Sequence, residues 1–154
     1  MQYPTKFYIS SGAGGSQYKL VAFDNALIAA GISNYNLLKV SSILPSFCEQ
    51  CDKVDAKEGS PLLTAFATIA SDKKGMRLAS AIAVGIPKDK SNIGVIMEYG
   101  DEQISANEAE HQAINMIRES MKNHRIEVEK ILSSSIEGTV QEGYLSLVSA
   151  IVLW

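Results

Sequence analysis

The 154-residue sequence lacks a long apolar run and an excess of positive charge. No hydrophobic stretch approaches the ~20 residues needed to cross a bilayer, and the N-terminus lacks the basic-then-apolar order of a secretory signal. The formal net charge is −3, whereas a surface that binds nucleic acid needs clustered lysines and arginines to neutralise phosphates. We therefore expect a soluble, cytoplasmic protein with neither a membrane nor a nucleic acid as its partner.

Residues that commonly bind metals are also scarce. The sequence holds two cysteines, Cys48 and Cys51, and two histidines, His111 and His124. The cysteines form one C-x-x-C pair, which in a reducing compartment could be a thiol pair or half of a zinc site. Because no second pair follows and the histidines lack metal-ligand spacing, the simpler interpretation is two cysteines in a polar loop and two surface histidines. We expect no metal cofactor.

A glycine-rich segment, Gly12 to Ser16, lacks the G-K-[ST] ending of a phosphate-binding loop. It follows an alternating run from Lys6 to Ser11 that is typical of a strand, so we interpret it as a flexible turn. Beyond it, apolar residues at helical spacing predict a helix from Ala22 to Ala30. This helix should end at Gly31 and carry Asp24 in its first turn.

The composition is sufficient for one core. With 46% hydrophobic residues, a chain of this length suits a single domain spanning residues 1–154. The clearest helix begins at Ser105, because Ser105 and Glu108 form a capping-box pattern, and it should end near Asn123. Strands are predicted over residues 36–42, 62–70, 78–86, 93–97, 126–136 and 143–153, and an exposed polar segment over 46–60.

Roughly seven strands and two helices are therefore expected. Two helices are too few to connect each pair of neighbouring strands in parallel. The sheets should accordingly be mixed or antiparallel, with the helices packed outside them. This pattern places the chain in the α+β class.

The most informative stretch is N-L-L-K-V-S-S-I-L-P, residues 36–45. A Ser-Ser pair alone is common at strand ends, where the hydroxyls cap the next turn. Here Ser41 and Ser42 close a predicted strand and precede Pro45, which cannot continue a central ladder. The interest of the pair lies in the other motifs that accompany it along the chain.

Five motifs in a fixed order give the chain a family resemblance. They are F-D-N-A-L from Phe23, A-G-I-S-N-Y-N-L from Ala30, V-S-S-I-L-P from Val40, I-P-K-D-K-S from Ile86 and G-V-I-M-E-Y from Gly94. Each is weak alone, but together they cover most of the chain and resemble the pyruvoyl-dependent arginine decarboxylases. The segment with Cys48 and Cys51 departs from the pattern. The resemblance implies a four-layer αββα sandwich of mixed or antiparallel sheets flanked by helices.

The resemblance also implies a zymogen that cuts itself between Ser41 and Ser42, into a β chain of residues 1–41 and an α chain of residues 42–154. The Ser42 hydroxyl would attack the Ser41 carbonyl to give an ester, β-elimination would leave dehydroalanine, and hydrolysis would release ammonia. A pyruvoyl group would then cap the α chain. Its ketone would form a Schiff base with the substrate and accept the electron pair left by carbon dioxide, so no pyridoxal phosphate is required.

Three further side chains receive roles from the same resemblance. Asn36 would donate a hydrogen bond to the developing oxyanion, and Glu98 would reprotonate the carbanion. Asp24 would bind the guanidinium of arginine from a neighbouring subunit, which requires a trimer or a dimer of trimers. By residue type alone, Asn36 also suits a loop end, Glu98 an exposed strand end, and Asp24 the N-terminus of a helix.

The expected reaction converts L-arginine to agmatine and carbon dioxide, for polyamine biosynthesis or for acid resistance. Two alternatives remain open. The same chemistry could act on another basic amino acid, because a carboxylate also attracts lysine or ornithine. In the second alternative, the chain is a non-catalytic ligand-binding or assembly homologue that never matures.

Overall fold

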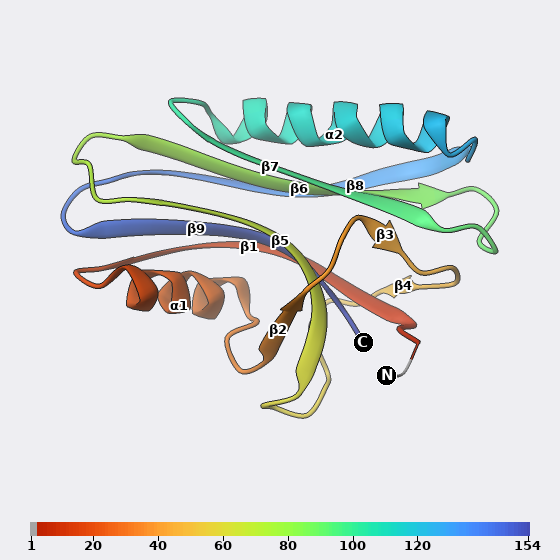
Figure 1. Ribbon diagram of the computed structural model, residues 1–154, viewed down its shortest axis with the longest axis horizontal. Helices are drawn as coiled ribbons and strands as arrows, with labels where there is room; N and C mark the ends of the chain where they lie inside the picture. The colour runs from red at the N-terminus through yellow and green to blue at the C-terminus, as the bar shows by residue number, and fades with distance from the viewer. Residues whose placement is uncertain (1–2) are drawn as a thin grey trace.

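Two β-sheets lie face to face between two helices. The computed structural model describes residues 3–154. Figure 1 shows helix α1 (Lys19–Ala30) on the outer face of one sheet and helix α2 (Ala106–Asn123) on the outer face of the other. Each sheet therefore has one face toward a helix and one toward the other sheet. The predicted α+β fold, a four-layer αββα sandwich, is confirmed.

The five-stranded sheet is mixed. In pairing order its strands are β2 (Asn36–Lys39), β5 (Pro61–Ser71), β9 (Tyr144–Leu153), β1 (Lys6–Ser16) and β4 (Glu49–Gln50). The three long strands pair antiparallel, whereas β2 and β4 run parallel to β5 and β1 at the two edges. The register of β1 and β9 extends from Phe7 opposite Leu153 to Ser16 opposite Tyr144, so the two ends of the chain meet inside this sheet.

The four-stranded sheet is antiparallel. In pairing order its strands are β3 (Ile43–Leu44), β7 (Gly94–Glu102), β6 (Arg77–Pro87) and β8 (Val128–Thr139). β6 lies between β7 and β8 and is buried from Leu78 to Pro87, because one of its faces meets α2 and the other meets the second sheet. This burial on both faces explains why the segment is apolar without alternation.

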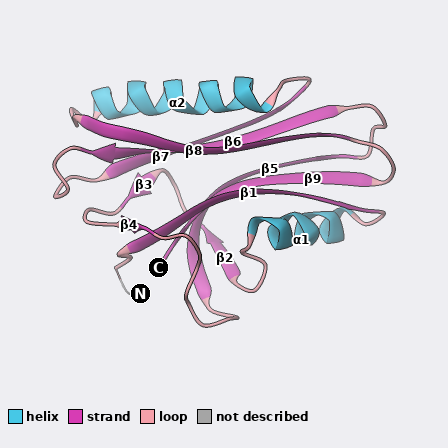
Figure 2. Cartoon of the chain, turned by 180° about the vertical axis from the view of Figure 1, so that it is seen from behind, coloured by secondary structure: helices cyan, strands magenta, loops and turns pink. Residues whose placement is uncertain are grey.

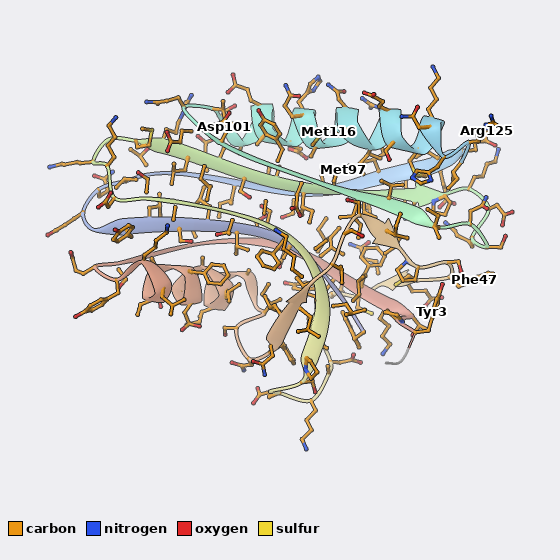
Figure 3. All side chains as sticks on the ribbon, viewed as in Figure 1. Tyr3, Phe47, Met97, Asp101, Met116 and Arg125 are labelled. Carbon is orange, nitrogen blue, oxygen red and sulfur yellow. The ribbon has the colours of Figure 1, made fainter. Side chains whose placement is uncertain are left out.

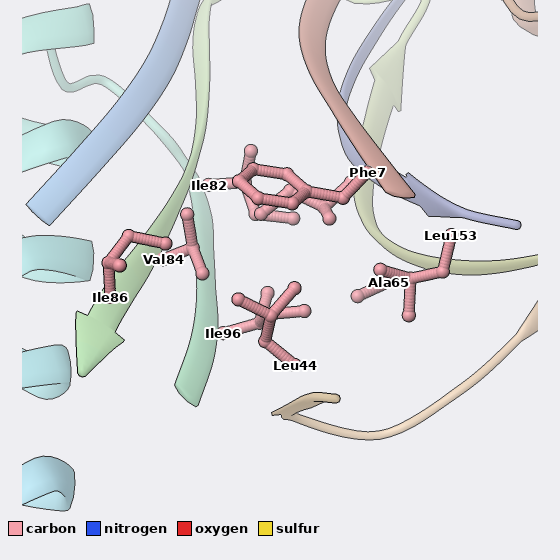
Figure 4. Packing of buried hydrophobic residues seen from close by; sticks show 9 residues of the cluster. Phe7, Leu44, Ala65, Ile82, Val84, Ile86, Ile96 and Leu153 are labelled. Carbon is pink, nitrogen blue, oxygen red and sulfur yellow. The ribbon is translucent and has the colours of Figure 1, made fainter. Parts of the chain in front are cut away.

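The space between the sheets is filled by an apolar core. Its buried members are Phe7, Leu44, Ala65, Ile82, Val84, Ile86, Ile96, Ile151 and Leu153 (Figure 4). Each large apolar side chain that is fully buried contributes about 1.5–3 kcal/mol to stability. Phe7 precedes the Ser41–Ser42 bond in sequence and the other members follow it. The core therefore joins the two segments without depending on that bond.

The glycine-rich segment is part of a strand. β1 continues through it to Ser16, and α1 packs directly against it (Figure 2). A Cβ atom added at Gly12 would lie 2.3 Å from the carbonyl oxygen of Ala26, and one at Gly14 would lie 2.3 Å from the backbone nitrogen of the same residue. These glycines allow the helix to approach the strand closely, so the predicted flexible turn is wrong.

Helix α1 begins earlier than predicted. It starts at Lys19 rather than Ala22, so Asp24 lies near its middle and the prediction that Asp24 occupies the first turn is wrong. The predicted end is confirmed. Gly31 has a φ of 75°, a left-handed conformation that glycine adopts without steric cost.

Helix α2 follows its sequence signals at both ends. The Ser105 hydroxyl accepts a hydrogen bond from the N–H of Glu108, and the Glu108 carboxylate accepts one from the N–H of Ser105. This reciprocal pair satisfies two backbone donors that the helix itself leaves free. The predicted start at the capping box and the predicted end at Asn123 are both confirmed.

The strand predicted over residues 36–42 is shorter in the structure. β2 ends at Lys39, and the N–H of Val40 makes a last hydrogen bond with the carbonyl of Thr64 (3.1 Å). The chain then leaves the five-stranded sheet and enters the four-stranded sheet at β3. Residues 40–42 form the crossing between the sheets, and they include the Ser41–Ser42 bond.

Candidate active site

Both sides of the Ser41–Ser42 bond are anchored, each to a different sheet. On one side, the hydrogen bond from Val40 to Thr64 ties the chain to β5; on the other, the carbonyl of Ser42 accepts a hydrogen bond from the N–H of Ile96 on β7 (2.8 Å). Ser41 is exposed and Ser42 is half-buried. The bond between them belongs to no strand and is held at both ends, which suits a peptide that must keep a fixed geometry while it reacts.

Glu98 lies on β7, two residues beyond the contact with Ser42. Two residues of strand span about 6.5 Å, and alternation of side chains puts Ile96 and Glu98 on the same face of β7. Ile96 packs in the core between the sheets, whereas Met97 packs beneath α2 (Figure 3). The Glu98 side chain therefore lies at the edge of the space between the sheets, on the strand that holds Ser42.

Burial raises the proton affinity of the Glu98 carboxyl. Its side chain is 35% exposed, and the ammonium of Lys39 lies 3.6 Å from its Oε1 atom. Burial raises the pKa of Glu98 above its ordinary value, because the charged form loses solvation; the positive charge of Lys39 opposes this effect without cancelling it. The result is a carboxyl that retains its proton to higher pH than an exposed glutamate, as a general acid requires.

Asn36 begins β2 and is tied to the preceding loop. Its Nδ2 atom donates to the carbonyl of Gly59 (2.9 Å), and its backbone N–H donates to the carbonyl of Ser60 (3.0 Å). Within residues 3–154, no hydrogen bond joins Asn36 to Ser41 or Ser42. The second N–H of its amide is free for another acceptor. The role of Asn36 as the oxyanion donor stays a prediction.

Asp24 is exposed on α1, and the five-stranded sheet separates it from the space that Glu98 faces (Figure 1). It lines a shallow hollow with Ile28 and four residues of the loop that follows α1, namely Gly31, Ser33, Asn34 and Tyr35. Neither Ser42 nor Glu98 lines this hollow. Within one copy of the chain, Asp24 is thus not part of the group formed by Ser42 and Glu98.

Two residues of the site, Lys39 and Phe66, carry no signal in the sequence. Lys39 Nζ donates to the carbonyl of Phe66 (3.1 Å) and lies 4.7 Å from the centroid of its ring. These contacts depend on the parallel pairing of β2 with β5 and on the packing of β7 against them. From the sequence N-L-L-K-V-S-S alone, Lys39 can be identified only as a charged residue that precedes the serines.

The residues that could bind metals lie apart from this group. Cys48 and Cys51 are free thiols on either side of β4, and burial raises the pKa of Cys48 to about 11, so its thiol is protonated. His111 and His124 are exposed. No cluster of three or more metal-ligating side chains occurs in residues 3–154. In the same range, no helix is both long and apolar enough to cross a membrane.

The comparison with known proteins decides the family. A family model described as pyruvoyl-dependent arginine decarboxylase matches residues 6–154. The chain belongs to this family. A relative of that name from Methanococcus aeolicus is 37% identical over 151 residues, which are 98% of this chain and 90% of the relative. Another, from Thermococcus kodakarensis, is 34% identical over 152 residues, 98% and 96% of the two chains. A third, from Methanocaldococcus jannaschii, is 37% identical over 139 residues, 90% and 84% of the two chains.

Membership in the pyruvoyl-dependent arginine decarboxylases confirms the predicted family and enzyme class, a carboxy-lyase. It also identifies a covalent pyruvoyl group as the cofactor, in place of pyridoxal phosphate. The residues near Ser42 fit such a group. Residue 42 is held by a backbone hydrogen bond, is partly shielded from water, and has a proton-retaining carboxyl on the adjacent strand.

Proposed function

We propose that this chain is a cytoplasmic, single-domain zymogen that cuts itself between Ser41 and Ser42 and then converts L-arginine to agmatine and carbon dioxide. The observation that carries the proposal is the position of the bond. It crosses between two sheets, is anchored on each side, and contacts β7, the strand that carries the half-buried carboxyl of Glu98. The names of the relatives support arginine as the substrate.

Cleavage begins with an acyl shift from nitrogen to oxygen. The Ser42 hydroxyl oxygen bonds to the Ser41 carbonyl carbon, the peptide C–N bond breaks, and the new ester has the freed amine of residue 42 beside it. Loss of the Ser42 α-proton then breaks the ester C–O bond and releases the Ser41 carboxylate. The dehydroalanine that remains tautomerises to an imine, and water displaces ammonia from it. The amide of Asn36 is proposed to stabilise the oxyanion of the first step.

Both products remain in one folded unit. The fragment 1–41 contains β1, whose register with β9 runs from Phe7 to Ser16 inside the five-stranded sheet. The fragment 42–154 supplies β9 and most of the core. Because these contacts do not depend on the cut bond, the new ends at residues 41 and 42 are held in place after cleavage.

After cleavage, residues of the chain bind the substrate and donate a proton to it. A pyruvoyl ketone supplies the electron sink for the pair of electrons that carbon dioxide leaves behind. The protonated carboxyl of Glu98 donates its proton to the α-carbon, and burial keeps that proton in place until it is needed. The Glu98 side chain then takes up a proton from solvent before the next turnover.

Recognition of arginine is assigned to Asp24 of a neighbouring copy. A carboxylate can accept paired hydrogen bonds from a guanidinium. On α1, Leu20 and Ile28 flank Asp24 by one turn on each side and are 77% and 57% exposed. An apolar surface of this kind suits a contact with a second copy, as a trimer or a dimer of trimers with shared sites would need.

The test is the mass of the purified protein together with its activity. The natural sequence should give two fragments, 1–41 and 42–154, and should form agmatine from arginine. Ser42→Ala should remain one chain near 16.7 kDa without activity. Ser46→Ala, a matched change in the following loop, should mature normally. An uncut natural chain that is nevertheless active would refute the proposal.

Product formation from arginine, lysine, ornithine and histidine, measured in parallel, tests the substrate. We expect turnover of arginine to exceed that of the other three, because only the guanidinium matches a carboxylate with two parallel hydrogen bonds. Faster turnover of lysine or ornithine would assign the same chemistry to a different basic amino acid. A natural chain that stays uncut and inactive would indicate a homologue without catalytic function.

A further inference from the structure

Lys39 is the charged residue that faces Glu98. The strands packed around β7 bring few other charges: β3 and β5 contain no charged residue, and β6 contains only Arg77, whose register partner Thr139 lies at the far end of the sheet. Among the described residues, Lys39 is the charge that alters the pKa of Glu98. Burial raises the pKa of this carboxyl, and Lys39 supplies the charge that opposes the rise.

Lys39 is itself held in place. Its ammonium donates to the carbonyl of Phe66 (3.1 Å), lies 4.7 Å from the centroid of the Phe66 ring, and lies 3.6 Å from Oε1 of Glu98. An exposed lysine usually samples many rotamers, and these contacts with a backbone oxygen and an aromatic face restrict it. The charge thus stands at a defined position between β5 and β7.

We propose that Lys39 is a positioning residue for decarboxylation, which orients the Glu98 carboxyl on the strand that contacts residue 42 through an ammonium–carboxyl contact between the two fragments of the mature enzyme. The inference rests on the proposed function, in which Glu98 is the proton donor. Lys39 belongs to fragment 1–41 and Glu98 to fragment 42–154, so the contact crosses the cut. Neither fragment alone would then contain both the carboxyl of Glu98 and the ammonium of Lys39.

The physical role of the charge follows from the proton transfer. An acid buried without a partner holds its proton tightly, because the carboxylate left after transfer is poorly solvated. The ammonium of Lys39 stabilises that carboxylate, so it lowers the free energy of the state in which the proton has moved to the substrate. Burial and Lys39 together give a carboxyl that keeps its proton to higher pH than an exposed glutamate but can still release it.

The first experiment compares Lys39→Met with Lys39→Arg in the mature enzyme. Methionine keeps an unbranched apolar stem over Phe66 but removes the charge, whereas arginine keeps the charge. A general acid contributes about 10²- to 10⁴-fold to rate, so we expect Lys39→Met to lower kcat about tenfold with little change in KM. The fall in activity at alkaline pH should move to higher pH, because Glu98 would hold its proton more tightly. Lys39→Arg should restore most of kcat and the natural pH profile.

Lys88→Met is the matched control. Lys88 also forms an exposed ion pair, with Glu127 at 3.0 Å, between the residue after β6 and the residue before β8. This variant should retain the natural kcat and pH profile. If Lys39→Met retains both as well, the proposal is wrong. A loss of kcat that Lys39→Arg does not restore, without any shift of the pH profile, would show that Lys39 has only a packing role and would also overturn it.

The second experiment does not depend on maturation. In the uncut Ser42→Ala background, the pKa of the Glu98 carboxyl is measured by carbon-13 NMR, with Glu98→Gln used to assign the signal. Adding Lys39→Met should raise this pKa, and adding Lys88→Met should leave it unchanged. An unchanged pKa on loss of Lys39 would overturn the proposal even if the Lys39 variants fail to mature.

The two sets of results separate this inference from the proposed function. If the natural chain never matures but the NMR titration shows the shift, the ion pair exists and the proposed function fails. If the chain matures and decarboxylates arginine but neither the titration nor the pH profile responds to Lys39, the proposed function stands and the role of Lys39 fails.

Discussion

Burial of the Glu98 carboxyl makes its ionised form less stable in the folded protein than in water, which is why its pKa is raised. The sign of the effect on stability follows from linkage. A carboxyl whose folded pKa exceeds its unfolded pKa favours the folded state when protonated. That contribution is present at low pH and is lost as the pH rises through the unfolded and then the folded pKa. At neutral pH, Glu98 therefore costs stability at a position where the proposed reaction needs an acid.

Glu98→Gln separates these two effects. The variant should mature into two fragments, because the acyl shift does not use the carboxyl, but kcat should fall by about 10²- to 10⁴-fold since no acid remains. Glu127→Gln, an exposed glutamate in the ion pair with Lys88, should leave kcat unchanged. In the natural enzyme, activity should decline as the pH rises through the pKa of Glu98. A fully active Glu98→Gln enzyme would place the proton donor elsewhere.

The stability of the same variant is measured in the uncut Ser42→Ala background. At neutral pH, Glu98→Gln should raise the denaturant midpoint, because glutamine carries no charge to desolvate. The gain should shrink near pH 4, where the carboxyl is largely protonated. A gain that did not depend on pH would point to packing rather than to the buried charge.

At the scale of elements, local signals predicted what local interactions determine. Ser105 and Glu108 satisfy each other within four residues, so the start of α2 follows from the sequence alone. Gly12 and Gly14 give no such local signal, because glycine is equally suited to a turn and to a strand in close contact with a helix. Only the packing of α1 on β1 distinguishes the two interpretations, and this contact is not local.

The same reasoning accounts for the site. The Ser41–Ser42 pair and Glu98 could be proposed as site residues because family motifs mark them. The contact of Lys39 with Glu98 could not, since it requires two sheets to be stacked in register.

Gly14→Ala tests the close contact between β1 and α1. The Cβ of the new alanine would lie 2.3 Å from the backbone nitrogen of Ala26, which cannot move without distorting the helix. We therefore expect a loss of about 3 kcal/mol or more in the free energy of unfolding. Gly15→Ala, the neighbouring residue, is the matched control because its nearest contact is at 3.6 Å. It should change stability by less than about 1 kcal/mol. Urea unfolding of the uncut Ser42→Ala background measures both variants, and equal losses would contradict the packing argument.

At the scale of the whole molecule, the fold distributes the proposed site residues over separate surfaces. Ser42 contacts β7, the strand that carries Glu98, whereas Asp24 lies on α1, beyond the five-stranded sheet. A site that uses all three within one copy would need a large rearrangement of α1, which packs tightly on Gly12 and Gly14. Assembly of several copies, as proposed, would bring the surfaces together without disturbing the fold.

Coexpression of two weak variants tests whether sites are shared between copies. Asp24→Asn should raise the KM for arginine, and Glu98→Gln should lower kcat by about 10²- to 10⁴-fold. In mixed oligomers, a copy that carries Asp24→Asn still supplies Glu98, and a Glu98→Gln neighbour still supplies Asp24. Random assembly from equal amounts would make about one quarter of the sites natural, so activity at low arginine should rise well above the sum of the separate variants.

Coexpression of Ser42→Ala with Glu98→Gln should restore nothing, because both residues serve the site of the same copy. If Asp24 acted within its own copy, the first mixture would also show no gain, since each copy would then keep its own defect.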